Sequence, residues 1–201
     1  MVNVVKEPHT ALFIGSTGCG KTQKVVELLQ NEYNCHYDYI VILCPTLREN
    51  KTYQSCKPLW TDDDVFLIDP EDKLLEWIEK FSNLFRGFET LFVIDDCIAT
   101  NELDKKRTKL LEIAISGRHR GHSLWLITQS YTAIPKNLRR QKKQLFTWFL
   151  DEQSDFDQIA KETNIIRDPE KWKEIQEKLD GSEFGCLHLR VKHPRGWELN
   201  C

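Results

Sequence analysis

Short apolar runs, each bounded by polar or turn-forming residues, recur along most of this chain. Runs of this length and composition predict fully buried strands. They occupy residues 11–14, 39–44, 65–68, 91–94 and 124–127, and residues 145–150 predict a further strand. Near the end of the chain, residues 187–191 alternate between apolar and polar side chains, which is typical of an edge strand with one covered face.

Helical signals separate the predicted strands. Residues 69–71 combine an N-cap aspartate, a proline for the first helical position and an acid for the first turn. The other predicted helices follow residue 20, run from about Glu102 to Ser116, begin at Pro135, and begin near Ser154 and at Asp168-Pro169. Buried strands that alternate with helices predict an α/β fold with a mostly parallel sheet flanked by helices.

The composition is typical of a soluble globular protein. Of the 201 residues, 29% are charged and 40% are hydrophobic. We expect a single domain over residues 1–201, with its core at about 8–150 and C-terminal helices and an edge strand at 151–201. No apolar run reaches the length of a membrane span, the N-terminus lacks a signal-peptide pattern, and the seven cysteines form no C-x-x-C pair. These features predict an intracellular protein with reduced thiols and no membrane partner.

The residues after the first predicted strand form a phosphate-binding loop. Gly15-Ser16-Thr17-Gly18-Cys19-Gly20-Lys21-Thr22 matches G-x-x-x-x-G-K-[ST] and lies between a strand and a helix, where the motif has a physical meaning. The loop N–H groups and the helix N-terminus can bind a β-phosphate, Lys21 can reach the β- and γ-phosphates, and the Thr22 hydroxyl can bind Mg²⁺. A glycine-rich turn that matches by chance is the alternative. The setting favours a site for a nucleoside triphosphate.

A carboxylate pair follows the strand predicted at 91–94. Leu91-Phe92-Val93-Ile94-Asp95 is the Walker B pattern, in which an aspartate at the end of a buried strand holds Mg²⁺. Asp95 is therefore the candidate metal ligand alongside Thr22, and Asp96 is the candidate for orienting and polarising the attacking water. Two aspartates that only cap the next segment are the alternative. The phosphate-binding loop upstream favours the functional interpretation.

A third polar element follows the strand predicted at 124–127, where the chain reads Thr128-Gln129. In a P-loop NTPase with a strand inserted between the Walker A and Walker B strands, such a strand end faces the γ-phosphate. Gln129 can then sense that phosphate or hold the attacking water. A strand-end amide that binds only local backbone groups is the alternative.

Two arginines lie in the turn before this strand. Arg118 and Arg120 are candidates for an arginine that one subunit supplies to the nucleotide of its neighbour. Such an arginine can raise the rate by about 10³–10⁵. A solvated basic turn is the alternative, and the sequence does not choose between the two arginines.

Positive charge is concentrated in one part of the chain. The net charge is −3, but residues 105–143 carry +10 and the remainder carries −13. The candidate phosphate contacts are Lys105, Lys106, Arg107, Lys136, Arg139, Arg140, Lys142 and Lys143, the last five on a predicted basic helix. Charge runs are commonly only solubilising. Their shared sign and their position after the candidate catalytic strands favour a polyanion partner whose binding weakens with salt.

Together these elements resemble the FtsK–HerA superfamily of RecA/ASCE-like P-loop NTPases, in particular the poxvirus-type genome-packaging ATPases of large DNA viruses. The resemblance covers roughly residues 8 to 150. Its points are the phosphate-binding loop, Leu91-Phe92-Val93-Ile94-Asp95-Asp96, Ser116-Gly117-Arg118-His119-Arg120, Leu126-Ile127-Thr128-Gln129-Ser130 and Ile134-Pro135-Lys136-Asn137-Leu138-Arg139. Many relatives in the wider superfamily carry glutamate where Asp96 stands, so the shorter side chain is a departure from the pattern.

The resemblance implies an ATPase that assembles into a homo-oligomeric ring, a pentamer or hexamer, and drives double-stranded DNA into a capsid through a portal or vertex protein. It implies ATP and Mg²⁺ as cofactors, Lys21 and Thr22 on phosphate and Mg²⁺, and Asp95 on Mg²⁺. It also implies Asp96 as the water-activating carboxylate, Gln129 as γ-phosphate sensor and an arginine finger near Arg118. The implied location is the host cytoplasm or nucleus at sites of virus assembly, or the virion itself.

Two other functions remain open at this point. A small phosphotransferase also uses a phosphate-binding loop, although the tandem aspartates are less typical of it. A nucleotide-switched assembly protein would bind the same ligand and hydrolyse it slowly. The residues alone support a Mg²⁺-dependent NTPase with a polyanion-binding face.

Overall fold

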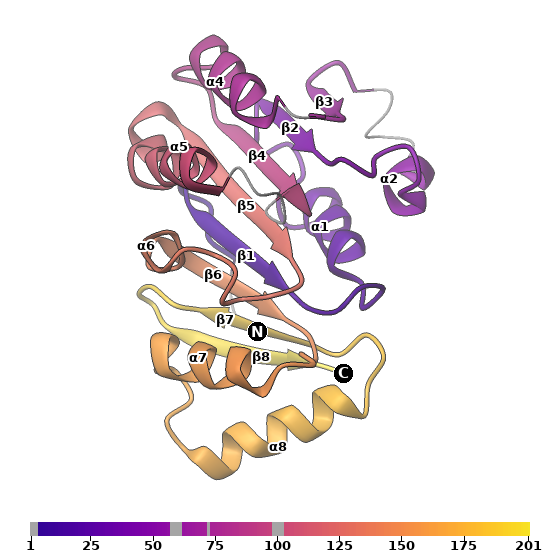
Figure 1. Ribbon diagram of the computed structural model, residues 1–201, viewed down its shortest axis with the longest axis vertical. Coiled ribbons are helices and arrows are strands. Elements are labelled where there is room, and N and C mark those ends of the chain that lie inside the picture. The colour runs from indigo at the N-terminus through magenta and orange to yellow at the C-terminus, as the bar shows by residue number, and fades with distance from the viewer. Residues whose placement is uncertain (1–3, 57–61, 72, 98–102) are drawn as a thin grey trace.

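One eight-stranded sheet forms the centre of the computed structural model (Figure 1). The structure describes residues 4–56, 62–71, 73–97 and 103–201, without the side chains of 103–109. The strands are β1 (Thr10–Ile14), β2 (Tyr39–Leu43), β3 (Val65–Ile68), β4 (Thr90–Asp95), β5 (His122–Thr128), β6 (Lys142–Thr147), β7 (Cys186–Arg190) and β8 (Gly196–Asn200). Their order is β3-β2-β4-β5-β1-β6-β7-β8, parallel up to β6 and antiparallel from β6 to β8.

Helices cover both faces of this sheet. They are α1 (Lys21–Gln30), α2 (Lys51–Ser55), α4 (Leu74–Leu84), α5 (Leu103–Ser116), the 3-10 turn η2 (Gly117–Arg120), α6 (Lys136–Arg139), α7 (Gln153–Thr163) and α8 (Pro169–Asp180). Side chains of β1 alternate between two core clusters, so that Ala11 and Phe13 pack with α1 and α2. Leu12 and Ile14 pack in the cluster that contains side chains of α4, α5, α7 and α8. A strand buried on both faces in this way is uniformly apolar, which explains the runs in the sequence.

The predicted α/β class with a mostly parallel sheet is confirmed, and each apolar run predicted as a strand overlaps one. Two helix predictions also agree with the structure. Gly117 directly follows α5, and Asp168 caps α8 by accepting the N–H of Glu170 at 3.1 Å. The predicted start of α5 at about Glu102 lies outside the described residues.

Several predicted boundaries are wrong, each for a local reason. Helix α4 begins at Leu74 and not at Pro70, because residues 69–71 form a turn in which the Asp69 carboxylate accepts the N–H of Glu71. Strand β6 spans Lys142–Thr147 and not 145–150, since its buried polar side chains find partners inside the protein. Helix α7 begins at Gln153 with Glu152 as its N-cap, not at Ser154.

The predicted edge strand at 187–191 is not at the edge. Strand β7 lies between β6 and β8, and β8 forms the edge of the sheet. The sequence did not predict the strand at residues 196–200, because only two of its residues, Trp197 and Leu199, are apolar and alternate with polar ones. Both side chains stay partly exposed. No helix among the described residues combines the length and apolar character that crossing a membrane would require.

A buried polar network links the strands beneath α1. Trp125 Nε1 donates to His9 Nε2 at 3.1 Å, and the Gln144 amide nitrogen lies 3.0 Å from the same atom. That amide also donates to Tyr33 Oη at 2.9 Å, while His188 Nε2 donates to Gln144 Oε1 at 3.1 Å. Burial lowers the pKa of His9 and of His188 to about 4, so both rings are neutral at physiological pH.

Candidate nucleotide site

The strand order brings the predicted Walker elements to one edge of the sheet. Strand β5 lies between β1 and β4, so an additional strand separates the Walker A strand from the Walker B strand. The Gly15 N–H donates to Thr128 O at 3.3 Å, and the Asp96 N–H donates to Ile127 O at 3.2 Å. The phosphate-binding loop, the aspartate pair and the end of β5 that precedes Gln129 are therefore neighbours, as the sequence predicts.

Lys21 holds the phosphate-binding loop in shape. Its Nζ donates to Gly15 O at 2.7 Å and to Ser16 O at 2.8 Å, and its side chain is buried against the loop. Gly18 and Gly20 have φ angles of 84° and 99°, a left-handed conformation that favours glycine. The loop then enters α1, whose N-terminus carries the positive end of the helix dipole. This arrangement can bind an anion with backbone N–H groups and an ammonium group.

The structure brings together the two residues predicted to bind Mg²⁺. Thr22 Oγ1 donates to Asp95 Oδ2 at 3.1 Å. The Tyr53 hydroxyl donates to the same Asp95 oxygen at 2.9 Å. Burial raises the pKa of Asp95 to about 6, although the hydrogen bonds from Tyr53 and Thr22 act in the opposite direction. A hydroxyl and a carboxylate are oxygen ligands of the kind that Mg²⁺ prefers.

Tyr53 escaped the sequence analysis, although its ring is fully buried. It lies on α2, a helix of five residues whose N-cap is Asn50. A helix this short produces no apolar periodicity, so the sequence gives no signal that its tyrosine reaches the Walker B strand. The structure adds Tyr53 to the site as a residue that orients the Asp95 carboxylate.

Asp96 and Gln129 both reach solvent at this edge, in contrast to the buried Asp95. Asp96 has a φ of 50°, which is uncommon for a residue other than glycine and costs about 1–3 kcal/mol. The turn directs the chain away from β4 directly after Asp95. The exposed carboxylate of Asp96 and the amide of Gln129 can therefore face a ligand that the loop holds.

Helix α7 fixes the segment that follows Gln129. The Asp155 carboxylate accepts the N–H of Tyr131 at 2.8 Å and the N–H of Thr132 at 2.9 Å. Asp155 is buried, so these two hydrogen bonds anchor the chain firmly. The C-terminal part of the chain thus contacts, through α7, the segment that follows β5 and Gln129.

Asp151 is a second site residue that the sequence analysis missed. It lies four residues after the end of β6, and its Oδ2 accepts a hydrogen bond of 2.8 Å from Ser16 Oγ in the loop. Its signal in the sequence is its position after a strand that ends at the same edge as the loop.

The first residue of the loop must be glycine. A Cβ atom added to Gly15 would lie 2.7 Å from Cys19 Sγ and 3.0 Å from Trp148 Cβ, so only glycine fits there.

Arg118 and Arg120 lie at the opposite edge of the sheet. They belong to η2, which precedes the amino end of β5, whereas Gln129 follows its carboxyl end. The seven residues of β5 span about 20 Å, so neither arginine can reach the loop of its own chain. Arg118 is exposed, while Arg120 binds Ser82 Oγ at 3.2 Å and Glu112 at 3.5 Å. Arg118 is therefore the better placed of the two to act on a neighbouring chain.

The predicted basic helix at 136–143 is wrong in its extent and partly in its role. Helix α6 ends at Arg139, and Lys142 begins β6. Arg139 and Lys142 are buried, which removes them from the predicted DNA contacts. Lys143 pairs with Glu7 at 3.0 Å. Lys136 and Arg140 are exposed and remain candidates. Lys105, Lys106 and Arg107 belong to α5, but their side chains lie outside the described part of the structure.

Glu162 is the reason that two cations are buried. Arg139 donates to both carboxylate oxygens of Glu162, at 2.8 and 3.1 Å, and Tyr131 Oη donates at 2.7 Å. Lys142 Nζ donates to Tyr131 Oη at 2.7 Å. Burial alone would raise the pKa of Glu162, but these hydrogen bonds lower it to about 2. Burial lowers the pKa of Lys142 to about 8.

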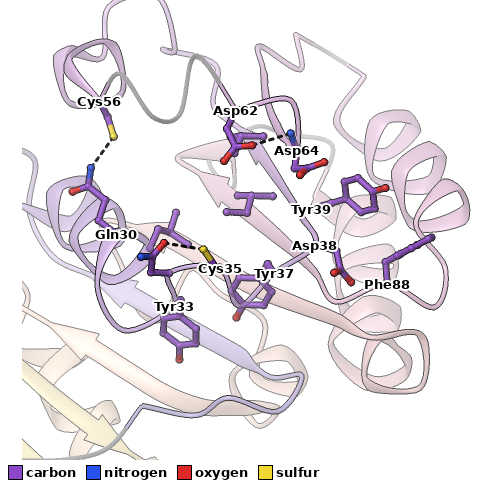
Figure 2. A pocket seen from close by; sticks show the side chains of 14 residues that line it. Gln30, Tyr33, Cys35, Tyr37, Asp38, Tyr39, Cys56, Asp62, Asp64 and Phe88 are labelled. Carbon is purple, nitrogen blue, oxygen red and sulfur yellow. Dashed lines mark hydrogen bonds between the residues drawn. The ribbon is translucent and has the colours of Figure 1, made fainter.

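Three cavities lined by described residues bear on the site, two at the phosphate-binding loop and one far from it. The first two have volumes of about 550 Å³ and 370 Å³. The third, of about 480 Å³, lies at the amino ends of β2 and β3 (Figure 2). Its labelled lining includes the tyrosines Tyr33, Tyr37 and Tyr39 and the aspartates Asp38, Asp62 and Asp64. This third cavity is at the wrong edge of the sheet to receive a nucleotide from the loop.

A protein-family model described as "Poxvirus A32 protein" matches residues 2–177. The chain belongs to the poxvirus A32 protein family. The predicted resemblance to poxvirus-type packaging ATPases is thereby confirmed. Among curated proteins, a sequence search finds no match to this A32-family chain.

Solved structures share the fold at low sequence identity. B204, the DNA-packaging ATPase of Sulfolobus turreted icosahedral virus, is 16% identical, with 98% of each chain covered and a TM-score of 0.70. The genome packaging NTPase B204 of Sulfolobus turreted icosahedral virus 2 in complex with AMPPCP is 16% identical, with 98% of this chain and 99% of that chain covered and a TM-score of 0.63. EssC (ATPases 2 and 3) from Geobacillus thermodenitrificans is 15% identical over 76% of this chain and 34% of its own, with a TM-score of 0.55.

Proposed function

We propose that this chain is a Mg²⁺-dependent ATPase that drives double-stranded DNA into a viral capsid. The observation that carries the ATPase part is the 3.1 Å hydrogen bond between Thr22 Oγ1 and Asp95 Oδ2, which joins the Walker A loop to the Walker B strand. Both oxygens suit Mg²⁺, and Lys21 begins the same helix turn as Thr22. The donor set therefore fits a Mg²⁺–nucleotide complex.

Each site residue has a role in the proposed reaction. The loop N–H groups and Lys21 bind and orient the phosphates. When bound, Mg²⁺ would neutralise charge on the phosphate oxygens, with Thr22 and Asp95 as its protein ligands. Asp96 orients and polarises the attacking water from the exposed end of β4, and Gln129 contacts the γ-phosphate from the end of β5.

The proposal of DNA packaging rests on family and fold together. The family is named after a poxvirus protein, and both B204 proteins that share the fold over nearly the whole chain are described as packaging enzymes. The exposed Lys136 and Arg140 supply positive charge for a DNA backbone. A capsid portal or vertex protein is then the expected second partner, and a site of virus assembly in the host cell is the expected location.

Assembly into a homo-oligomeric ring, a pentamer or hexamer, is part of the proposal. Arg118 and the phosphate-binding loop lie at opposite edges of the sheet, so an arginine finger at Arg118 requires a second copy of the chain. An arginine supplied from a neighbour can raise the rate of hydrolysis by about 10³–10⁵.

Phosphate release from ATP tests the proposal. We expect purified protein to release phosphate with Mg²⁺, faster with duplex DNA at low salt, and Lys21→Ala to lower the rate by about 10²–10³. Lys80→Ala is the control, because Lys80 is an exposed lysine of α4. We expect its rate to equal that of the wild type.

Two outcomes would contradict the motor. Transfer of phosphate to a small acceptor without free phosphate would indicate a phosphotransferase. Wild-type turnover as slow as that of Lys21→Ala, unchanged by DNA, would indicate a nucleotide-switched assembly protein.

A further inference from the structure

The larger of the two cavities at the phosphate-binding loop lies on the side of β1 away from the Walker B strand. It has a volume of about 550 Å³. Its lining comes from the loop, from α1 and the residues just after it, and from the segment after β6. The start of β7 and the end of β8, which pair with each other at this edge of the sheet, complete the lining. The lining residues are Cys19, Gly20, Gln23, Lys24, Glu27, Glu32, Trp148, Phe184, Cys186, Glu198 and Asn200.

The sheet order fixes the direction in which a bound nucleotide extends. Asp95 and Gln129, which define the γ-phosphate end, follow β4 and β5 on one side of β1. The phosphates lie on the loop after β1 itself. The nucleoside must therefore project to the other side of β1, over β6, β7 and β8. There Cys186 pairs with Asn200, and both border the cavity.

An exposed aromatic ring stands at this cavity. Phe184 is 61% exposed, although a phenylalanine is normally buried. A Cβ atom added to Gly20 would lie 3.5 Å from Phe184 Cδ1 and 3.9 Å from Trp148 Nε1, so both rings approach the phosphate-binding loop directly. An exposed aromatic face beside the loop is a surface on which a base can stack.

The polar side chains around the ring suit the edge of a base. The amides of Gln23 and Asn200 can each donate and accept hydrogen bonds. Lys24 is paired with Glu27 at 2.9 Å and does not place an uncompensated charge in the cavity. A neutral heteroaromatic ring with donors and acceptors on its edge is the ligand that this lining matches.

The smaller cavity, of about 370 Å³, is the competing place for the nucleoside. It borders the tip of the loop and contains the acidic side chains of Asp151, Asp180 and Glu183. Ser16 in the loop is already bound to Asp151 there. The larger cavity is also lined by three carboxylates, those of Glu27, Glu32 and Glu198, but it contains Lys24, paired with Glu27, and the exposed ring of Phe184, so it is favoured for the base. Phe149, which is 36% exposed, lines the smaller cavity and offers a matched control.

We propose that the base of the bound nucleotide stacks on Phe184 in the larger cavity, which makes Phe184 a residue that distinguishes nucleotides from inorganic polyphosphate. This inference rests on the proposed ATPase function. Phe184 lies in the turn between α8 and β7. The part of the chain after β6, and not only the Walker region, would therefore form part of the nucleotide site.

The test compares two ligands and three variants. Dissociation constants for ATP and for inorganic tripolyphosphate, both with Mg²⁺, are measured by calorimetry on the full chain. We expect Phe184→Ala to weaken ATP binding roughly ten-fold and to leave tripolyphosphate binding unchanged, since the variant loses base stacking but keeps every phosphate contact. Phe184→Trp should retain ATP binding, and Phe149→Ala should bind both ligands as the wild type does.

Three results would overturn the inference while the wild type still binds ATP. These are wild-type ATP affinity in Phe184→Ala, an equal loss for both ligands in that variant, and a selective loss of ATP affinity in Phe149→Ala. A wild-type protein that binds neither ligand would instead refute the proposed function, and the inference with it.

Discussion

Glu162→Gln tests how much the buried cations depend on one anion. The Glu162 side chain is 12% exposed, and those of Arg139 and Lys142 are 9% and 3% exposed. Glutamine keeps the volume and some hydrogen bonds of glutamate but removes the negative charge. Arg139 and Lys142 would then remain buried without a counter-ion, which is costly in a low-dielectric interior.

The pKa of Glu162 gives the magnitude. It falls from 4.5 to about 2 on folding, and each pKa unit corresponds to 1.36 kcal/mol, so the ionised carboxylate stabilises the fold by about 3 kcal/mol. A lowered carboxylate pKa means that this contribution is complete above about pH 4.5 and is lost as the pH falls toward 2. Removal of one partner of a buried pair costs about 3–5 kcal/mol, which agrees.

Urea unfolding at pH 7 measures the loss. With a slope near 2–3 kcal/mol per molar urea, we expect the midpoint to fall by roughly 1 M. Glu174→Gln on α8 is the control, because Glu174 also accepts hydrogen bonds from two lysines, Lys171 and Lys178, but on the surface. Exposed ion pairs contribute little, so its midpoint should not change. Equal midpoints for the two variants would refute the reasoning.

Two further predictions concern acid and salt. His9 and His188 are neutral when folded down to about pH 4 but take up protons below about pH 6.5 when unfolded. Stability should therefore fall as the pH drops from 6.5 to 4.5, by roughly 2 kcal/mol for each histidine, and urea midpoints in that range check it. Replacing both Lys136 and Arg140 by alanine should reduce the slope of log affinity for duplex DNA against log salt by about two, and an unchanged slope would exclude these contacts.

The Walker elements could be predicted because each is local. The phosphate-binding loop needs only consecutive residues between a strand and a helix, and Asp95 needs only an apolar run before it. That Asp95 meets Thr22 follows from a parallel sheet, whose strands end at one edge. The sequence therefore predicted the fold class and the proximity of Thr22 and Asp95, the proposed Mg²⁺ ligands, together.

The roles of the basic residues could not be predicted, because they depend on partners distant in the chain. Arg139 and Lys142 look like surface charge until Glu162, about twenty residues later, is placed beside them. The same limit applies to Tyr53, which is 42 residues from Asp95 in the sequence. A run of charged residues in the sequence shows only that the residues are charged. Whether Arg139 and Lys142 are buried depends on how α7, which carries Glu162, packs on the sheet.

The placement of η2 and the phosphate-binding loop at opposite edges of the sheet also restricts symmetry. A contact that joins the Arg118 surface of one copy to the loop surface of the next is a head-to-tail contact, because the two surfaces lie at opposite ends of β5. In such a head-to-tail assembly each copy would both supply an arginine and receive one, and closure into a ring leaves no copy without a donor. An open arc of copies would leave the nucleotide site at one end without an arginine from a neighbour. Closure of the ring would therefore complete the last active site.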